Sequence, residues 1–474
     1  MKMIIGGEWV GRDETINVCN PYDNSVVDTV PRGTSKDIDL ALAAAQRGYE
    51  INRRLPAHER IAILLRTAKL MEERFEDLAV TIATEGSKTI GEARKEVGRA
   101  INTITISAEE ARRLDGETIP FDSAPGGENR IGYYYRFPIG IIAAITPFND
   151  PLNLVAHKLG PAIAGGNSVV CKPATVTPLS ALKLGQCLLD AGLPGEVLSI
   201  VTGYGSEIGD ALVEDPRPRM ISFTGGVEAG ESISHKAGLK KVGMELGSNS
   251  PVIVLADCYL EEAVESCVSG SFWAVGQNCI GVQRVYVERS VFDDFRDRFV
   301  ERTKQYKVGP QLDESTDMGP MINEQEAVRV IEWVDEAKSQ GATVLTGGTR
   351  EGSRVQPTVM CDMPAGAKLD CQEVFGPVVT LYPVDDLDEA IERSNAVDYG
   401  LHGAIFTRDL DKAFHAIREM DVGGIIVNDS TDYRVDLMPF GGVKKSGLGR
   451  EGIKFSLQEM TEPKMVCLNL KTGG

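Results

Sequence analysis

The stretch IGIIAAITPFNDPLNLVAHKLGPAIAGGNSVVCK, residues 139–172, decides the fold of this chain. Ile139–Ile145 and Ser168–Lys172 are short apolar runs of strand length, and Pro151–Gly165 between them has the length and apolar content of a buried helix. A helix that joins two apolar strands is the usual connection between parallel strands. The stretch therefore predicts one strand–helix–strand unit of a parallel sheet.

The same alternation continues to residue 238, and a second series begins after Pro251. The first series is expected to continue with Pro178–Ala191, Val197–Val201, Ser206–Val213, Met220–Phe223 and Val227–Gly238. The second series is expected at Val252–Leu255, Leu260–Val275, Arg284–Glu288, Val291–Tyr306, Glu324–Gln340, Val378–Tyr382, Leu387–Asn395, Gly403–Phe406, Leu410–Met420 and Gly424–Val427. Together they predict an α/β fold with two doubly wound, Rossmann-like parallel-sheet domains. The break at Gly247–Pro251 is the expected boundary, with a site in the cleft between the domains.

Two segments lie outside these series. Residues 36–50 and 57–83 carry apolar side chains at helical spacing and predict amphipathic helices before the first sheet. Residues 121–138 predict a protruding β-hairpin, with a turn at Pro125-Gly126-Gly127 and a second strand at Arg130–Arg136. The edges of such a hairpin are unpaired, so we expect something else to cover them.

The composition excludes several classes of protein. A chain of 474 residues is too long for one core and favours two or three domains. Its net charge of −19 offers no basic face for nucleic acid. The nine cysteines include no Cys-x-x-Cys pair, so we expect free thiols in a reducing compartment and a cytoplasmic protein. No stretch is long and apolar enough for a membrane span, so we expect no membrane partner.

Cys279, in Gly276-Gln277-Asn278-Cys279, is the residue on which the functional interpretation depends. A cysteine accompanied elsewhere in the chain by a suitable acid and amide is a candidate nucleophile. Its thiolate would add to a carbonyl carbon, and the side-chain amide of Asn149 could stabilise the resulting oxyanion. Glu245 could then activate the water that hydrolyses a thioester. This chemistry needs no metal, because the thiol forms the covalent bond.

Seven motifs, in order along the chain, resemble those of the aldehyde dehydrogenase superfamily. They are Pro147-Phe148-Asn149, Val170-Cys171-Lys172-Pro173, Ser222-Phe223-Thr224-Gly225-Gly226, Glu245-Leu246-Gly247, Gly276-Gln277-Asn278-Cys279, Glu373-Val374-Phe375-Gly376-Pro377 and Pro439-Phe440-Gly441-Gly442. The resemblance implies a dinucleotide-binding domain (1–120 and 139–247), a catalytic domain (248–440) and an oligomerisation arm (121–138 and 455–474). It also implies a homodimer or homotetramer. Members that pass the acyl group to coenzyme A generally lack the base, so Glu245 favours hydrolysis.

The resemblance further implies NAD or NADP as the cofactor. Thr224-Gly225-Gly226 follows a predicted strand and opens a helix, where backbone N–H groups can meet a pyrophosphate. Gly203-Tyr204-Gly205 also follows a strand and would be as good a candidate on its own. Thr175 stands where many NAD-preferring members have Glu, so we expect NAD to be favoured and NADP tolerated. The implied cofactor-binding residues are Thr146, Pro147, Phe148, Lys172, Thr175, Thr224, Gly225, Gly226, Leu246, Glu373 and Phe375.

The substrate pocket departs from that of members that oxidise apolar aldehydes. This chain has His157 and Arg434 where those members often place aromatic residues, and Arg434 precedes the motif that contains Phe440, which is also expected to bind substrate. Arg112 and Arg113, on the helix before the hairpin, are expected at the same mouth. Guanidinium groups suit phosphonate, phosphate, sulfonate or carboxylate. We therefore expect NAD(P)-dependent oxidation of a small anionic (phosphono-, phospho- or sulfo-) aldehyde, such as a phosphonoaldehyde, to its carboxylic acid.

Two alternatives stay open. The chain is similar to the branch that contains lactaldehyde, glyceraldehyde-3-phosphate and phosphonoaldehyde dehydrogenases, so a neutral hydroxyaldehyde such as lactaldehyde or glycolaldehyde could bind to His157 and Arg434. A non-catalytic relative is the other alternative, which intact Asn149, Glu245 and Cys279 disfavour. Some phosphonoacetaldehyde-oxidising relatives have Arg where this chain has Asn278, so the particular substrate stays open.

Overall fold

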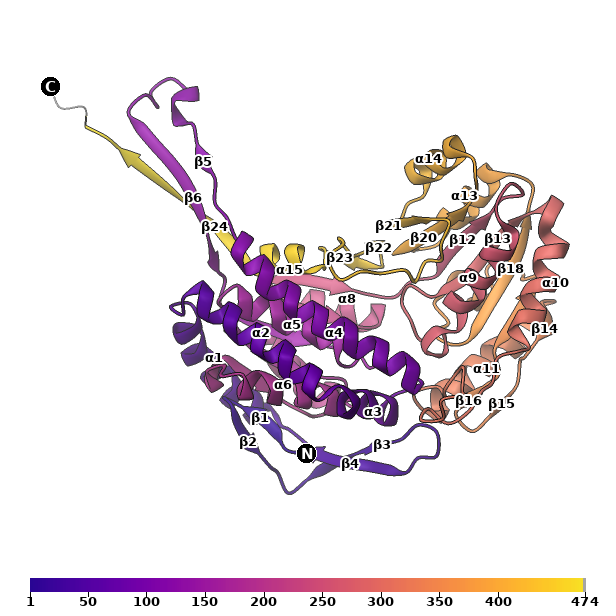
Figure 1. The fold of residues 1–474 in the computed structure, drawn as a ribbon, viewed down its shortest axis with the longest axis horizontal. Coiled ribbons are helices and arrows are strands. Elements are labelled where there is room, and N and C mark those ends of the chain that lie inside the picture. The colour runs from indigo at the N-terminus through magenta and orange to yellow at the C-terminus, as the bar shows by residue number, and fades with distance from the viewer. Residues whose placement is uncertain (472–474) are drawn as a thin grey trace.

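The computed structural model describes residues 1–471 and consists of two α/β bodies and a projecting arm (Figure 1). The first body is built on an eight-stranded sheet. Its strands, in spatial order, are β2 (Glu8–Val10), β1 (Met3–Ile5), β9 (Leu198–Ile200), β8 (Ser168–Lys172), β7 (Ile141–Ile145), β10 (Pro218–Thr224), β11 (Lys241–Glu245) and β23 (Gly447–Leu448). The strands from β9 to β11 run parallel, while β1 and β23 join the two sides of this group in antiparallel orientation.

Helices cover both faces of this sheet because its central strands are apolar on both sides. The helices are α1 (Ser35–Asn52), α2 (Ala57–Glu73), α3 (Phe75–Glu85), α4 (Ile90–Glu110), α5 (Asn153–Ala164), α6 (Leu179–Asp190), α7 (Gly205–Glu214), α8 (Val227–Lys236) and α15 (Ile453–Glu459). Ile142 and Ala144 of β7 pack toward α5, α6 and the helices behind them. Ile141 and Ala143 pack toward α1 and α7 on the other face.

The second body repeats this layered arrangement around its own core. Its sheet has the order β14 (Thr343–Thr346), β17 (Thr358–Cys361), β18 (Val378–Val384), β13 (Val282–Glu288), β12 (Ser250–Val254), β20 (His402–Phe406) and β21 (Gly424–Val427), and only the β14–β17 pair is antiparallel. Its helices are α9 (Leu260–Phe272), α10 (Phe292–Thr303), α11 (Glu324–Ser339), α12 (Lys368–Cys371), α13 (Leu387–Asn395) and α14 (Leu410–Glu419). The predicted fold class, two doubly wound sheets, is confirmed.

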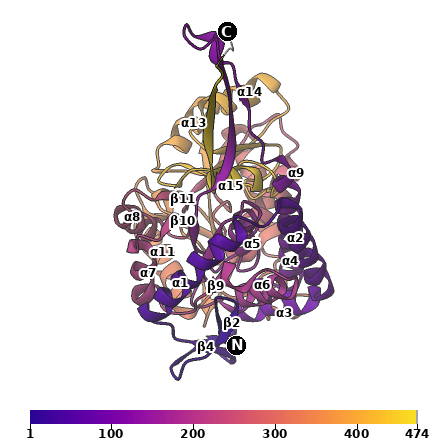
Figure 2. The same cartoon turned by 90° about the vertical axis from the view of Figure 1, so that its left-hand side faces the viewer.

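The arm is a narrow three-stranded sheet that stands away from both bodies in Figure 1, and its tip projects at the top of Figure 2. Its strands are β5 (Thr118–Ile119), β6 (Arg130–Pro138) and β24 (Thr461–Asn469). β24 pairs with β6 from Thr461 opposite Pro138 to Asn469 opposite Arg130, so the C-terminal strand covers one edge of the predicted hairpin. Three small pairs complete the strands: β3 (Thr15–Cys19) with β4 (Val26–Pro31), β15 (Arg350–Glu351) with β16 (Arg354–Val355), and β19 (Tyr399–Gly400) with β22 (Val443–Lys444).

The structure corrects several predicted boundaries. The helix expected over residues 57–83 is broken at Arg74 into α2 and α3. The first hairpin strand is β5, before Phe121, and Phe121–Ser123 forms a 3-10 turn. The arm predicted over 455–474 begins within α15, which packs on α4 and α5, and its residues 472–474 lie outside the described residues. Within residues 1–471 no helix is long and apolar enough to cross a membrane.

Candidate active site

The predicted catalytic residues come from the ends of strands in the first body and from a turn in the second. Asn149 follows β7, and Glu245 is the last residue of β11. Between these strands runs β10, whose Thr224 lies opposite Glu245. Cys279 comes from the second body and lines a pocket of about 390 Å³ together with Asn149. The carboxyl edge of the first sheet thus faces the candidate nucleophile, as expected for a ligand site of a doubly wound fold.

The backbone that carries Cys279 is strained. The predicted helix Leu260–Val275 ends at Phe272, because Ala274, Val275 and Gly276 have φ values of 50°, 62° and 66°. The left-handed region is unfavourable for a β-branched residue such as Val275. A Cβ on Gly276 would lie 2.3 Å from the carbonyl oxygen of Gly376, so only glycine fits there. Surrounding contacts must hold this turn in place.

The half-buried Cys279 thiol has an oxyanion site beside it. Burial raises the pKa of Cys279 to about 12; Arg434 opposes this rise, and the negative charges of Glu373 and Glu245 add to it. The thiol is therefore neutral in this state and must lose its proton to react. Neither the Asn149 side chain nor the backbone N–H of Cys279 has a hydrogen-bond partner within residues 1–471. Both are free to donate to an oxyanion.

Glu245 has the surroundings of a general base. Its side chain is 4% exposed, and Oε2 has no partner among the described residues. Burial and then the negative charge of Glu451 raise the pKa of Glu245 well above its usual value. Lys158, which donates to Glu451 Oε1 at 2.7 Å, and Arg434 oppose that rise. Sequence reasoning missed the buried Lys158–Glu451 pair, which has no signature in the motifs.

The cofactor loop lies beside this base. Thr224, Gly225 and Gly226 join the end of β10 to the first turn of α8, where backbone N–H groups are free. The Oγ1 atoms of Thr146 and Thr224 are buried without a partner within residues 1–471, which a dinucleotide could supply. Leu246 instead packs against Gly230, where an added Cβ would lie 2.5 Å from its side chain.

Lys172 and Thr175 follow β8 at the same edge of the sheet. Burial lowers the pKa of Lys172 to about 8, and its Nζ donates to the carbonyl of Pro173. Thr175 Oγ1 donates to the carbonyl of Gly203 at 3.0 Å, so the second glycine turn, Gly203-Tyr204-Gly205, lies beside Thr175. Thr175 offers a hydroxyl and no negative charge at this edge.

Glu373 and Phe375 face the site from the second body. Glu373 Oε1 accepts from the Ser248 N–H at 2.8 Å, and burial raises the pKa of Glu373 to about 8. A Cβ on Gly247 would lie 2.3 Å from Glu373 Oε2. The rings of Phe375 and Phe148 pack edge to face, with their centres 5.8 Å apart. This contact joins the segment that carries Asn149 to the second body. The buried hydroxyls, the free helix N-terminus and this carboxylate fit a nicotinamide dinucleotide.

Arg434 lines the same pocket as Cys279. Its guanidinium carbon lies 3.7 Å from the centre of the Phe440 ring, which is buried beside Cys279. Its Nε has no partner within the described residues, and the nearest carboxylate oxygen, Glu451 Oε2, is 3.8 Å away. Its side chain is only 6% exposed. Among residues 1–471 the guanidinium thus has one ion-pair partner, Glu451, and no hydrogen bond to a carboxylate, which leaves N–H groups available to an anionic ligand.

His157 does not line the pocket. It is fully buried, and its Nε2 lies 2.8 Å from Asp436 Oδ1 and 3.5 Å from an Arg434 nitrogen. Burial and then Arg434 lower the pKa of His157, so a neutral ring is favoured. The expected contact of His157 with substrate is therefore not what the structure shows, because α5 turns its side chain into the protein. His157 supports the arrangement of Arg434 from behind.

Arg112 and Arg113 also lie elsewhere. They are exposed in a 3-10 turn after α4, and Arg113 pairs with Glu110 at 2.7 Å. The basic residues that α4 brings to the pocket are Lys95 and Arg99. Arg99 donates to Asp436 at 3.0 Å and to Asp150 at 3.4 Å. The four-residue spacing of Lys95 and Arg99, which puts both on one helix face, was the available signal.

Known proteins share this arrangement. The aldehyde dehydrogenase family model matches residues 9–466. An aspartate-semialdehyde dehydrogenase of Pseudomonas canavaninivorans is 49% identical over 455 residues, 96% of this chain and 97% of that protein. A 3-sulfolactaldehyde dehydrogenase of Priestia aryabhattai is 47% identical over 468 residues, 99% and 98% of the two chains. A lactaldehyde dehydrogenase of Methanococcus aeolicus is 40% identical over 473 residues, 99% and 100% of the two chains.

Two solved structures are equally similar in fold. Aldehyde dehydrogenase 21 of Physcomitrella patens, in complex with its reaction product succinate, has a TM-score of 0.97 at 41% identity over 99% of this chain and 98% of that one. The NADP-dependent glyceraldehyde-3-phosphate dehydrogenase of Bacillus halodurans, complexed with NADP, has a TM-score of 0.97 at 40% identity over 99% of both. This chain belongs to the aldehyde dehydrogenase family and is an oxidoreductase that uses NAD or NADP.

Proposed function

We propose that this protein oxidises a small aldehyde that carries an acid group, by way of a thioester on Cys279. The thiol gives its proton to water in the pocket and its sulfur bonds to the aldehyde carbon, while the oxyanion receives hydrogen bonds from Asn149 and the Cys279 N–H. When bound, NAD or NADP would supply the acceptor for the hydride that this carbon releases. Residues at the edge of the first sheet, Thr224 and Lys172 among them, would hold the dinucleotide.

Glu245 completes the reaction. The thioester is hydrolysed when Glu245 takes a proton from water and the hydroxide oxygen bonds to the acyl carbon. The carbon–sulfur bond then breaks, and the thiol regains a proton. The buried, partner-free Oε2 of Glu245 suits this role, because it can accept that proton without losing another hydrogen bond.

The observation that carries the acid-group proposal is the Arg434 guanidinium on the pocket wall, with no carboxylate within hydrogen-bond distance. Lys95 and Arg99 also line the pocket from α4, together with the carboxylates of Asp150 and Asp432, and Arg99 is paired with Asp150 and Asp436. The names of similar proteins agree, since aspartate semialdehyde, 3-sulfolactaldehyde and glyceraldehyde 3-phosphate carry carboxylate, sulfonate and phosphate groups, and succinate has a second carboxylate. We favour a carboxylate or sulfonate over the phosphonate, because Asn278 supplies no further charge.

The second candidate is a neutral hydroxyaldehyde. It is favoured by the similarity to a lactaldehyde dehydrogenase at 40% identity. The burial of His157 weakens it, because that ring cannot reach a substrate hydroxyl.

The deciding experiment compares Arg434→Ala with the wild type on succinate semialdehyde and on butanal, which has the same carbon chain without the acid group. A charge-assisted bond contributes about 1.5–3 kcal/mol, so KM for succinate semialdehyde should rise roughly 10–100-fold while KM for butanal changes little. Arg434→Lys keeps the charge but not the planar fork and should recover part of the loss. Equal effects on the two aldehydes would reject the acid-group proposal.

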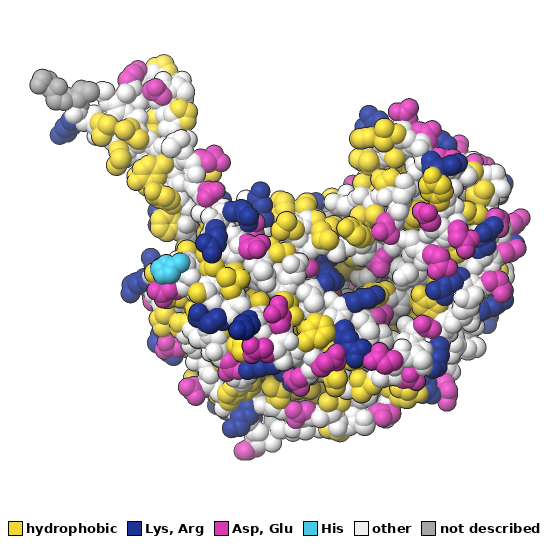
Figure 3. Space-filling view, viewed as in Figure 1, with side chains coloured by type: hydrophobic (Ala, Val, Ile, Leu, Met, Phe, Trp, Pro, Cys, Tyr) yellow, Lys and Arg dark blue, Asp and Glu magenta, His cyan; other side chains and the backbone are white. Residues whose placement is uncertain are grey.

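We further propose a homodimer or homotetramer held by the arm. Figure 3 shows hydrophobic side chains along the arm and on the part of the second body that faces it. Ile131, Tyr135 and Met465 on the arm are 53%, 57% and 57% exposed, and Leu410 and Phe414 of α14 are 70% and 50% exposed. Such surfaces are typical of subunit interfaces. Light scattering at micromolar concentration would test this, and a monomer would contradict it.

A further inference from the structure

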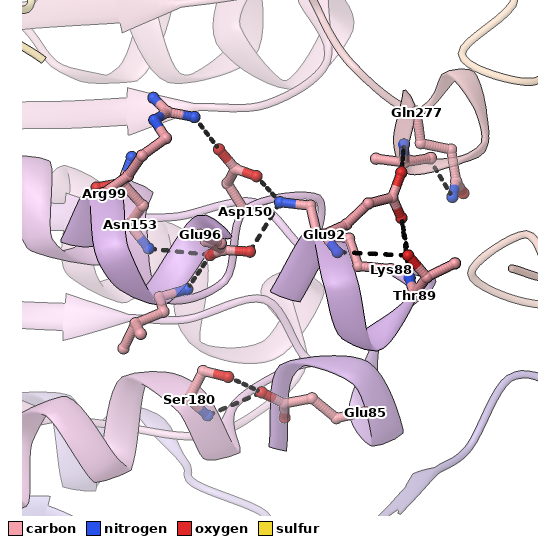
Figure 4. Close-up of polar contacts among 12 residues, drawn as sticks. Glu85, Lys88, Thr89, Glu92, Glu96, Arg99, Asp150, Asn153, Ser180 and Gln277 are labelled. Atoms are coloured by element: carbon pink, nitrogen blue, oxygen red, sulfur yellow. Dashed lines mark hydrogen bonds and ion pairs between the residues drawn. The ribbon is translucent and has the colours of Figure 1, made fainter. Parts of the chain in front are cut away.

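We propose that Glu92 is a positioning residue that holds the strained turn in front of the nucleophile. Glu92 lies in the first turn of α4, in the first body, while the turn that it contacts belongs to the second. The inference rests on the proposed role of Cys279 and adds to it a residue that never touches substrate or cofactor. Figure 4 shows Glu92 between Thr89 and the segment that carries Gln277.

The Glu92 carboxylate accepts hydrogen bonds from both directions. Its Oε2 accepts from the N–H of Thr89 at 2.9 Å and from the Thr89 hydroxyl at 3.2 Å, and the Thr89 hydroxyl accepts from the Glu92 N–H. This is the capping box of α4. Its Oε1 reaches across to the other body and accepts from the N–H of Ala274 at 2.8 Å. One side chain thus caps a helix and binds the nucleophile turn.

Few other hydrogen bonds hold the turn in its conformation. The Ala274 carbonyl accepts from the Gln277 N–H at 3.0 Å, which closes the left-handed segment Ala274–Gly276. The Gln277 side chain accepts from the Ile322 N–H at 3.0 Å. Each non-glycine residue in a disfavoured conformation costs about 1–3 kcal/mol, so the turn would relax without these contacts. Relaxation would move Cys279, which is two residues beyond Gln277, relative to Asn149.

Two neighbouring carboxylates show what is particular to Glu92. Glu85 accepts from the N–H groups of Leu179 and Ser180 at 2.7 and 2.8 Å and so caps α6 (Figure 4). Glu96 accepts from the N–H groups at the start of α5. Both act within the first body. Of these three carboxylates, only Glu92 joins the two bodies at the nucleophile turn.

The chain itself suggests the variant that separates the two roles of Glu92. At the start of α1, Thr34 and Asp37 form the same capping box, with Asp37 accepting from the Thr34 N–H at 2.8 Å. Glu92→Asp should therefore keep the cap of α4. Its carboxylate would be shorter by one carbon–carbon bond, about 1.5 Å, and would not reach Ala274. Glu85→Gln, which weakens a cap away from the nucleophile, is the matched control.

The measurements are the pre-steady-state burst of reduced cofactor with succinate semialdehyde, the rate of Cys279 alkylation by iodoacetamide followed by peptide mass spectrometry, and Tm. In Glu92→Asp we expect the burst rate to fall roughly 10–100-fold with KM within about twofold, because misplacement by about 1 Å can lower rates by that factor. The rate at which iodoacetamide alkylates Cys279 in Glu92→Asp should also differ from the wild-type rate. Glu85→Gln should lower Tm but leave the burst and the alkylation rate unchanged.

An unchanged burst in Glu92→Asp, or equal slowing in Glu92→Asp and Glu85→Gln, would overturn the positioning role. If Glu92→Asp does not fold, Glu92→Gln is measured in its place, and its burst rate is compared with that of Glu85→Gln. Glutamine has the length of glutamate, but its amide N–H would face one of the backbone N–H donors. Failure of the proposed function would look different. The wild type itself would then show no burst, and no acyl adduct would be found on Cys279.

Discussion

The end of the pocket where we propose that the reaction occurs, the reacting end, and the end that we propose binds the acid group, the acid-binding end, are built in different ways. At the reacting end, Asn149 and Glu245 sit where strands finish, and Cys279 sits on a fixed turn between elements. At the acid-binding end, Arg99 and Arg434 come from a helix face and from a loop, and Asp436 accepts a hydrogen bond from Arg99. Strand ends are fixed by the sheet register, whereas a helix face depends on which turn of the helix passes the pocket.

This difference between strand ends and a helix face determines which residues of the pocket can be exchanged without moving the backbone. A residue at a strand end keeps its place when its neighbours change, so the reaction chemistry can stay the same across relatives. A side chain on a helix face can be exchanged without moving the backbone, so the acid-binding end can change with the substrate. The comparison therefore predicts large effects on turnover at the first end and substrate-dependent effects on KM at the second.

The largest effect is expected from Glu245→Gln. Loss of the general base should lower steady-state turnover by about 10²–10⁴-fold while the burst of reduced cofactor persists, because acylation of Cys279 does not need that base. Stopped-flow absorbance at 340 nm measures both phases. Cys279→Ala is the control, since it should abolish the burst as well. Normal turnover in Glu245→Gln would remove Glu245 from the mechanism.

The pH dependence of deacylation follows from the same carboxylate. Burial and Glu451 raise the pKa of Glu245, and the base acts when ionised. Hydrolysis of the acyl-enzyme should therefore slow as pH falls through this raised pKa, and this dependence should vanish in Glu245→Gln. Glu451→Gln removes a neighbouring negative charge and should shift the dependence to lower pH. A shift to higher pH would contradict the assigned cause.

The sequence placed Asn149 and Glu245 at the edge of the first sheet, where the structure also has them, for a physical reason. Apolar strands and the glycine-rich turns that follow them are local signals, so the edge of the sheet could be placed from residues 139–172 outward. The acid-binding end was predicted only at Arg434. Arg99, Asp436 and Glu92 act through contacts between segments far apart in the chain, such as the Glu92–Ala274 bond, and no local pattern reports them.

A smaller effect, on the preference between NAD and NADP, is expected at the edge of the first sheet where Thr175 lies. Thr175→Glu would place a carboxylate where this chain has a hydroxyl, and like charges at close range are unfavourable. The value of kcat/KM with NADP should fall roughly 10–100-fold, and that with NAD should change little or rise. Initial rates with each cofactor measure this. Wild-type enzyme that discriminates against NADP by several orders of magnitude would contradict the expected tolerance.

The smallest effect on KM is expected from Arg112 and Arg113, which follow the C-terminal end of α4. These two residues test most directly whether the turn of the helix that passes the pocket decides substrate binding. Arg112 lies 13 positions beyond Arg99, a distance of about 20 Å along a helix, and Arg113 is engaged with Glu110. The double variant Arg112→Ala/Arg113→Ala should therefore leave KM for succinate semialdehyde within about twofold of the wild type, since surface pairs contribute little. Arg99→Ala, on the same helix, should raise that KM and leave KM for butanal nearly unchanged. If the double variant instead matched Arg99→Ala, the anion would bind by general attraction to basic residues and not by contact with one helix turn.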